Sequence, residues 1–152
     1  MKILMVCLGN ICRSPLAHGM LQHLADEKAL GWTVHSAGTG NWHVGNPPDH
    51  RSVAAAKRLG YDISTQRARH FSPSFFDEYD HILVMDSNNL KDVLRLATTP
   101  QQKQKVRLFL PEGEVADPYY DNALFDPVSK QVEQRCKELI TELKLQYRFI
   151  GI

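Results

Sequence analysis

Short continuous apolar runs alternate along the chain with longer segments in which apolar residues recur at helical spacing. The first run, KILMVC at residues 2–7, contains β-branched residues and predicts a strand buried on both faces. Further strands are predicted where similar runs recur, at residues 32–39, 81–86 and 105–110.

The segments between these runs predict helices. In the first, Ser14 is expected to be the N-cap with Pro15 at the first helical position, and Gly31 is expected to end the helix. Three further helices are predicted, at residues 49–60, 88–97 and about 127–147.

Strands that alternate with helices imply an α/β fold, with a parallel sheet covered by helices on both faces. The other segments are polar and rich in glycine and proline, as is typical of loops within one domain. They lie at residues 38–49, 72–80, 98–104 and 111–126. We therefore expect a single domain over residues 1–152.

The charge balance bears on the possible partners of the protein, and the cysteine count on its compartment. With 18 Lys and Arg against 17 Asp and Glu, the formal net charge is +1, which indicates neither nucleic acid nor an anionic membrane. The N-terminal apolar run stops after Leu8 without a cleavage site, and no segment approaches the roughly 20 apolar residues of a membrane helix. An odd number of cysteines, three, favours a reducing setting over a disulfide framework. We expect a cytoplasmic protein without nucleic-acid or membrane partners.

The segment VCLGNICRSPLA carries the candidate chemistry. In open α/β sheets ligands bind beyond the carboxyl ends of the strands, and Cys7 ends the first predicted strand. The loop over residues 8–13 leads into a helix N-terminus, so its backbone N–H groups can converge on an anion, and Arg13 adds a planar fork for two phosphate oxygens. These positive surroundings favour a thiolate. We expect the Cys7 sulfur to attack phosphate bound here, with Ser14 hydrogen-bonded to the sulfur.

Three other interpretations of this segment agree less well with its residues. A cysteine that ends a buried strand is usually a small apolar residue, but Gly9, Asn10 and Pro15 are the types that a tight loop and a helix start require. No Gly-Lys-Ser/Thr follows, which excludes a Walker-type nucleotide loop. Cys7 and Cys12 lack a second Cys/His pair at ligand spacing, so no metal site is expected.

Attack by a thiolate requires a proton donor for the departing oxygen. The segment ADPYYD supplies Asp117, on a loop that Pro118 stiffens and to which Tyr119 and Tyr120 add aromatic walls. Asp117 would protonate the leaving oxygen and then accept a proton from the water that cleaves the thiophosphate. Spacing leaves other carboxylates open for this role, namely Asp86, Glu112, Asp121 and Asp126.

VCLGNICRSP near the N-terminus and ADPYYDN near the C-terminus together resemble the low-molecular-weight protein tyrosine phosphatases. The resemblance covers essentially the whole chain, since SAGTGNWHVGNPPD, RARHF and ILVMDSNNL fall at corresponding places. The fold that it implies has three layers, α/β/α, with a four-stranded parallel sheet in strand order 2-1-3-4 and a phosphate loop after strand 1. The activity that it implies needs no cofactor.

The resemblance also implies individual roles. Cys7 is the nucleophile, Arg13 the phosphate clamp, Ser14 the partner of the thiolate, and Asp117 the general acid and base. The implied substrate-binding residues are Leu8, Gly9, Asn10, Ile11, Cys12, Trp42, Tyr119 and Tyr120.

Three residues are expected to brace the phosphate loop. Asn10 would fix its unusual backbone, since asparagine tolerates a left-handed conformation, and the resemblance implies Ser36 as a hydrogen-bond partner of Asn10. Gln66 stands where many family members carry a histidine that braces Asn10. An amide can also form this hydrogen bond.

Related activities of the same fold stay open as alternatives. Arsenate reductases relay a disulfide through further cysteines, for which Cys136 on the last predicted helix is too remote. Protein-arginine phosphatases typically carry Thr where Ile11 stands and have a less aromatic acid loop, so Ile11, Tyr119 and Tyr120 favour phosphotyrosine. The aromatic cleft resembles eukaryote-like members more than the bacterial subgroup tied to capsule kinases.

A non-catalytic phosphate-binding module and a redox sensor are the alternatives from another class. The loop folds back on itself, which can bring Cys7 and Cys12 within the roughly 7 Å Cα limit of a disulfide. The resemblance to family members that carry this pair also implies a redox switch. A reversible disulfide would protect Cys7 from oxidation to sulfinic acid. The favoured expectation is a monomer or weak dimer that dephosphorylates phosphotyrosine proteins and aryl phosphates and binds inorganic phosphate or sulfate.

Overall fold

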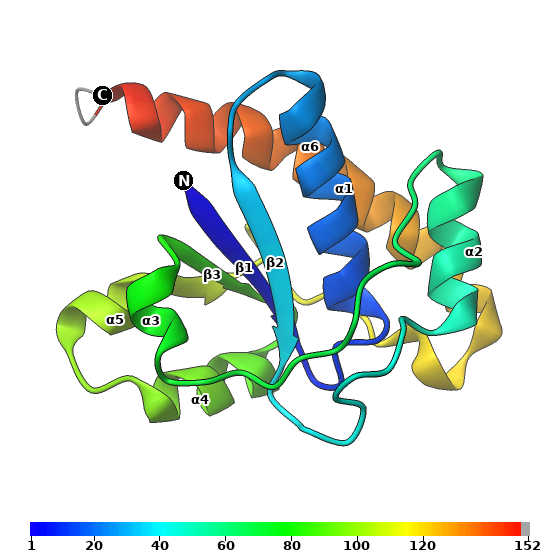
Figure 1. Ribbon diagram of the computed structural model, residues 1–152, viewed down its shortest axis with the longest axis horizontal. Helices are drawn as coiled ribbons and strands as arrows, with labels where there is room; N and C mark the ends of the chain where they lie inside the picture. Colours follow the sequence, from blue (N-terminus) through cyan, green and yellow to red (C-terminus); the bar gives the residue numbers. More distant parts are fainter. Residues whose placement is uncertain (150–152) are drawn as a thin grey trace.

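The computed structural model describes residues 1–149, and its centre is one four-stranded parallel sheet (Figure 1). The strands are β1 (Lys2–Cys7), β2 (Thr33–Gly38), β3 (His81–Val84) and β4 (Val106–Leu108). Their order in the sheet is β2-β1-β3-β4, and every neighbouring pair is parallel. The predicted α/β class and the strand order 2-1-3-4 are confirmed.

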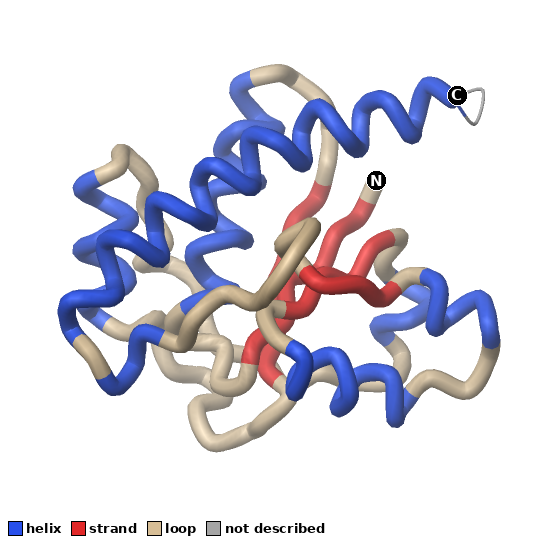
Figure 2. The backbone as a smooth tube through the Cα atoms, turned by 180° about the vertical axis from the view of Figure 1, so that it is seen from behind, coloured by secondary structure: helices blue, strands red, loops and turns tan. Residues whose placement is uncertain are grey.

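Helices cover both faces of the sheet, which Figure 2 shows between the two helical layers. One layer contains α1 (Arg13–Glu27), α2 (His50–Arg58) and α6 (Phe125–Phe149). The other contains α3 (Phe75–Glu78), α4 (Ser87–Leu96) and α5 (Pro100–Gln104). Within β1, Ile3 and Met5 pack toward the first layer and Leu4 and Val6 toward the second, because successive side chains of a strand point to opposite faces.

Several predicted boundaries are wrong. Helix α1 begins at Arg13, one residue before the predicted N-cap Ser14, and its N-cap Cys12 forms no side-chain capping hydrogen bond. The helix ends at Glu27, before the predicted end at Gly31. The short helices α3 and α5 lie in segments predicted as loops.

The carboxyl ends of β1 and β2 meet at one edge of the sheet, where the candidate site begins. The Thr39 and Gly40 N–H groups donate to the carbonyls of Cys7 and Leu8, at 2.9 and 2.8 Å. A side chain at Gly38 would lie 2.8 Å from the Leu8 carbonyl, so this close approach requires glycine. In the described part of the chain, none of the helices is both long and apolar enough to cross a membrane.

Candidate active site

The loop between β1 and α1 surrounds the sulfur of Cys7. Cys7 is buried, and its Sγ lies 3.0 Å from the Ser14 Oγ and accepts a hydrogen bond from the Asn10 N–H at 3.3 Å. Asn10 has φ 57°, the left-handed conformation that was expected for it. This turn brings the loop back over the sulfur.

The Asn10 side chain fixes the direction of the hydrogen bonds around the sulfur. Its Oδ1 accepts from the Arg69 backbone N–H at 2.9 Å, so its Nδ2 must be the atom that donates to the Ser14 Oγ, at 2.8 Å. Because Ser14 accepts from Asn10, its own proton is free to point at the Cys7 sulfur. A donor aimed at the sulfur suits a nucleophile that carries negative charge.

The expected braces Ser36 and Gln66 have other partners, so this part of the prediction is wrong. The Ser36 Oγ lies 2.9 Å from the His18 Nδ1 on α1. The Gln66 Nε2 donates to the Pro15 carbonyl at 3.0 Å. The Asn10 side chain is held instead by the Arg69 N–H, which donates to its Oδ1, and by the Ser14 hydroxyl, which accepts from its Nδ2. Gln66 therefore braces the first turn of α1 and not Asn10.

Arg13 is buried beside the sulfur and held from two sides. Its Nη1 donates to Asp86 Oδ2 at 2.7 Å and to the Val115 carbonyl at 3.1 Å, and its Nη2 lies 3.8 Å from Asp117 Oδ2. Burial alone would lower the pKa of Arg13, but the Cys7 sulfur, Asp86 and Asp117 raise it overall. The guanidinium therefore stays charged and has a fixed orientation.

The predicted acid, Asp117, precedes a 3-10 turn, η1 (Pro118–Tyr120), at the mouth of the site. Its Oδ1 accepts from the Tyr119 N–H at 3.1 Å, while its Oδ2 faces Arg13. Its side chain is 37% exposed, which leaves it open to a leaving group and to water.

The other carboxylates that spacing left open have different surroundings. Asp86 holds Arg13 and caps α4 through the Asn89 N–H at 2.8 Å. Asp121 accepts from the Ala123 N–H, Asp126 pairs with Arg58 at 2.6 Å, and Glu112 is exposed. Of the five candidate carboxylates, all within the described residues, Asp117 alone lines the cleft.

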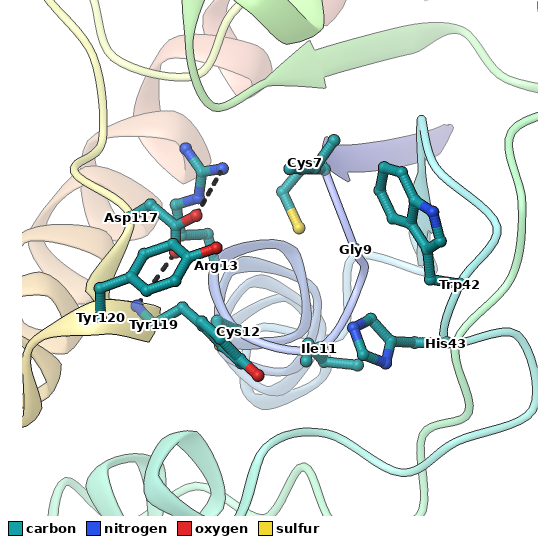
Figure 3. Close-up of a pocket in the computed structure, with 11 residues that line it drawn as sticks. Cys7, Gly9, Ile11, Cys12, Arg13, Trp42, His43, Asp117, Tyr119 and Tyr120 are labelled. Atoms are coloured by element: carbon teal, nitrogen blue, oxygen red, sulfur yellow. Dashed lines mark hydrogen bonds and ion pairs between the residues drawn. The ribbon is translucent and has the colours of Figure 1, made fainter.

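The cleft has a volume of about 340 Å³, with the Cys7 sulfur at its floor (Figure 3). Asp117, Arg13 and the two tyrosines lie on one side of the sulfur, and Trp42 and His43 on the other. Trp42 and Tyr120 are 69% and 90% exposed, so their rings form the rim. The lining contains ten predicted residues: Cys7, Leu8, Gly9, Ile11, Cys12, Arg13, Trp42, Asp117, Tyr119 and Tyr120.

His43 and Asp86 depart from the sequence-based picture of the site. The side chain of Asn10 is buried and holds the loop, so its contact with substrate, through the backbone, stays a prediction. His43 was missed, although it follows Trp42 directly, and its ring lies against Gly9 in the cleft wall. The sequence analysis names Asp86 as a possible acid, whereas its position between a strand end and a helix start is typical of an N-cap.

Comparison with known proteins decides the family. The family model described as low molecular weight phosphotyrosine protein phosphatase matches residues 2–148. The chain belongs to this family. The human low molecular weight phosphotyrosine protein phosphatase is 36% identical over 148 residues, which cover 91% of this chain and 93% of the human one.

Solved structures agree with the fold of this phosphatase. A protein tyrosine phosphatase from Entamoeba histolytica, with Hepes in its active site, superposes with a TM-score of 0.90 at 33% identity, covering 97% of this chain and 99% of the other. The Drosophila arginine phosphatase DARP superposes with a TM-score of 0.86 at 31% identity, covering 95% and 98%. The family and the fold predicted from the sequence are confirmed.

The three cysteines of the phosphatase are free thiols in different surroundings. Burial, followed by the charges of Asp49 and Cys7, raises the pKa of Cys12 to about 12, so Cys12 is a neutral thiol in the same loop as Cys7. Cys136 is fully buried on α6, where its S–H donates to the Ala17 carbonyl at 3.8 Å. Burial raises the pKa of Cys136 as well.

Proposed function

We propose that this phosphatase hydrolyses phosphotyrosine in proteins, and small aryl phosphates, by transferring the phosphoryl group first to the Cys7 sulfur and then to water. One observation carries the proposal: a sulfur, a guanidinium and a carboxylate line the same cleft, and aromatic rings form its rim. A nucleophile, an anion-binding group and a proton donor therefore all lie within reach of a single phosphoryl group bound in the cleft.

In the first step the Cys7 sulfur attacks phosphorus and the bond to the leaving phenolic oxygen breaks. The electron pair of that bond stays on the oxygen, which takes the proton of Asp117. Loop N–H groups and Arg13 stabilise the phosphoryl oxygens during the transfer.

In the second step water attacks the phosphocysteine. Asp117, now a carboxylate, accepts a proton of the water, and the S–P bond breaks. Its electron pair returns to sulfur, where the Ser14 hydroxyl stabilises the thiolate. The products are inorganic phosphate and the starting enzyme, so the cycle balances without a metal or cofactor.

Aromatic walls support an aryl substrate. Trp42, Tyr119 and Tyr120 surround the entrance, and a phenyl ring can stack on such walls. The likeness to an arginine phosphatase keeps phosphoarginine as the second candidate, because both substrates place a phosphoryl group at the floor. Ile11 in the lining favours the apolar phenyl ring.

A side-by-side assay tests the proposal. A phosphotyrosine peptide and aryl phosphate should be hydrolysed efficiently, with phosphoarginine and arsenate as poor substrates, and added chelator should change nothing. Preferential turnover of phosphoarginine or reduction of arsenate would overturn the assignment.

Cys7→Ser is the decisive variant, and Cys136→Ala is its matched control. The serine variant should lose turnover and keep phosphate binding, because the loop donors and Arg13 remain. The control removes a buried thiol that lies outside the cleft lining and should stay active. Activity in Cys7→Ser would reject the nucleophile.

We also propose that Cys7 and Cys12 form a reversible disulfide. Hydrogen peroxide would take up two electrons and two protons from the thiols and yield two waters as the S–S bond forms. After enough peroxide to oxidise an unprotected sulfenic acid to the irreversible sulfinic acid, dithiothreitol should restore activity in the wild type but not in Cys12→Ser. Equal recovery in both would reject the pair.

We place the enzyme in the cytoplasm, as a monomer or weak dimer. Free thiols at Cys7, Cys12 and Cys136 support a reducing setting.

Sedimentation at increasing concentration tests the oligomeric state. A stable assembly larger than a dimer would contradict the proposed monomer or weak dimer.

A further inference from the structure

Arg51, near the start of α2, is fixed relative to the phosphate loop although it lies outside the cleft lining. Its Nε and Nη2 donate to the two carboxylate oxygens of Asp49, at 3.0 and 2.8 Å, a bidentate pair. Asp49, the N-cap of α2, in turn donates its backbone N–H to the Ile11 carbonyl at 2.8 Å. The guanidinium is therefore tied to the phosphate loop through one residue.

The other side of the same guanidinium contacts the acid loop, defined here as residues 117–124. Its Cζ lies 5.4 Å from the centre of the Tyr119 ring and 4.5 Å from that of Phe125, at the start of α6. Its Nη1 donates to the Asn122 Oδ1 at 2.6 Å. Arg51 thus holds the acid loop at two points and the helix that follows it at a third.

Asp117 is coupled to this contact through its neighbour. The Tyr119 N–H donates to the Asp117 carboxylate, so a shift of Tyr119 moves the hydrogen bond that orients the acid. The hydrogen bonds from Arg51 lower the pKa of Asp49, so this pair stays ionised.

We propose that Arg51 is a positioning residue for proton transfer, which sets the acid loop against the phosphate loop and so holds Asp117 beside the leaving oxygen. The inference rests on the proposed function, since it requires Asp117 to be the proton donor.

The chain offers a matched control on the same helix. Arg58 pairs with Asp126 at 2.6 Å, and both side chains are about half exposed. This pair also joins α2 to α6, but neither residue lines the cleft. Exposed ion pairs of this kind contribute little stability, so removing Arg58 reports the cost of losing a surface arginine alone.

The test measures kcat/KM of the full chain for a series of aryl phosphates, from p-nitrophenyl to phenyl. Arg51→Ala should lower kcat/KM for phenyl phosphate about ten- to a hundredfold, because a misplaced acid costs most where the leaving oxygen needs the proton. For p-nitrophenyl phosphate the loss should be much smaller. The kcat/KM of Arg51→Lys for phenyl phosphate should lie between those of Arg51→Ala and the wild type, since lysine keeps the charge without the planar fork. Arg58→Ala should match the wild type.

A second arm places the substitution in an Asp117→Asn background. If Arg51 acts through Asp117, adding Arg51→Ala there should cause no further loss with phenyl phosphate. The same loss in both backgrounds, an equal loss for every leaving group, or a result equal to Arg58→Ala would overturn the inference. Asn122→Ala removes a single contact and should shift the leaving-group dependence in the same direction if Arg51→Ala does not fold.

Failure of the proposed function gives a different result. In that case the wild type releases no phenol, or Asp117→Asn leaves the rate for phenyl phosphate unchanged. Failure of this inference alone leaves both of those measurements intact and appears only in the Arg51 variants.

Discussion

At the scale of single residues, the direction of the hydrogen bonds around Cys7 matters as much as their number. A backbone N–H fixes the Asn10 amide, the amide fixes Ser14 as an acceptor, and the Ser14 proton is thereby left for the sulfur. Under the proposed mechanism, this donor stabilises the thiolate when it attacks and again when it leaves.

Replacement of Ser14 by alanine tests this chain of donors. A hydrogen bond to a charged group contributes about 1.5–3 kcal/mol, so Ser14→Ala should slow phosphocysteine breakdown about ten- to a hundredfold. Rapid mixing should still show a burst of phenol, followed by a reduced steady-state rate.

Ser129→Ala is the matched control for that experiment. Ser129 is also a buried serine, but its hydroxyl donates to the Phe125 carbonyl within α6 at 2.7 Å. Equal steady-state rates in the two variants would remove Ser14 from the proposed mechanism.

At the scale of elements, sequence patterns predict the strands better than the short helices. A buried strand such as β1 carries its own signal, because its apolar run is continuous. Helices α3 and α5 are too short to show periodicity, and they depend on local contacts: Phe76 is fully buried, and the Thr99 side chain caps α5.

The cleft lining was largely predictable, because the carboxyl ends of parallel strands meet at one edge and the loop motifs lie there. The partners of buried polar groups were not. Asn10 is held by the backbone of a residue 59 positions away, and a backbone N–H carries no sequence signature. Gln66 likewise binds a backbone group, the Pro15 carbonyl, whereas Ser36 binds the His18 side chain on a different element, α1.

The contact between α1 and β2 makes stability depend on pH. Burial, followed by the charges of His35 and Arg69, lowers the pKa of His18 from 6.5 to about 4. Between these values the unfolded chain binds a proton that the folded protein does not, so the free energy of unfolding should fall as pH decreases from 6.5 toward 4. Above pH 6.5 His18 is neutral in both states, and this loss of stability is absent.

Urea unfolding of His18→Gln across this pH range tests the assignment. The variant should show a shallower loss of stability, with some slope left, because burial also lowers the pKa of His35 and His81. An unchanged slope in His18→Gln would contradict the assignment.

At the scale of the whole molecule, the cleft is where the sheet, α1 and the acid loop meet, so an anion bound there should stabilise the entire fold. A ligand that binds only the folded state adds about 2.7 kcal/mol at a concentration one hundred times its Kd. Inorganic phosphate should therefore raise Tm.

The thermal shift should require Arg13, since its buried guanidinium is the charged donor beside the sulfur. Arg13→Ala should lose the shift, and Arg58→Ala should keep it. An equal rise of Tm in Arg13→Ala, or with chloride at the same ionic strength, would show that phosphate acts elsewhere.

The most direct test of the central claim is to find the phosphoryl group on the enzyme. Asp117→Asn should accumulate phosphocysteine from p-nitrophenyl phosphate, because this leaving group needs little acid whereas the attack of water needs the base. After rapid denaturing quench, peptide mass spectrometry should place one phosphoryl group on Cys7 and none in the variant that also carries Cys7→Ser. A phosphoryl group on another residue, or phenol release without any phosphoenzyme, would contradict the mechanism.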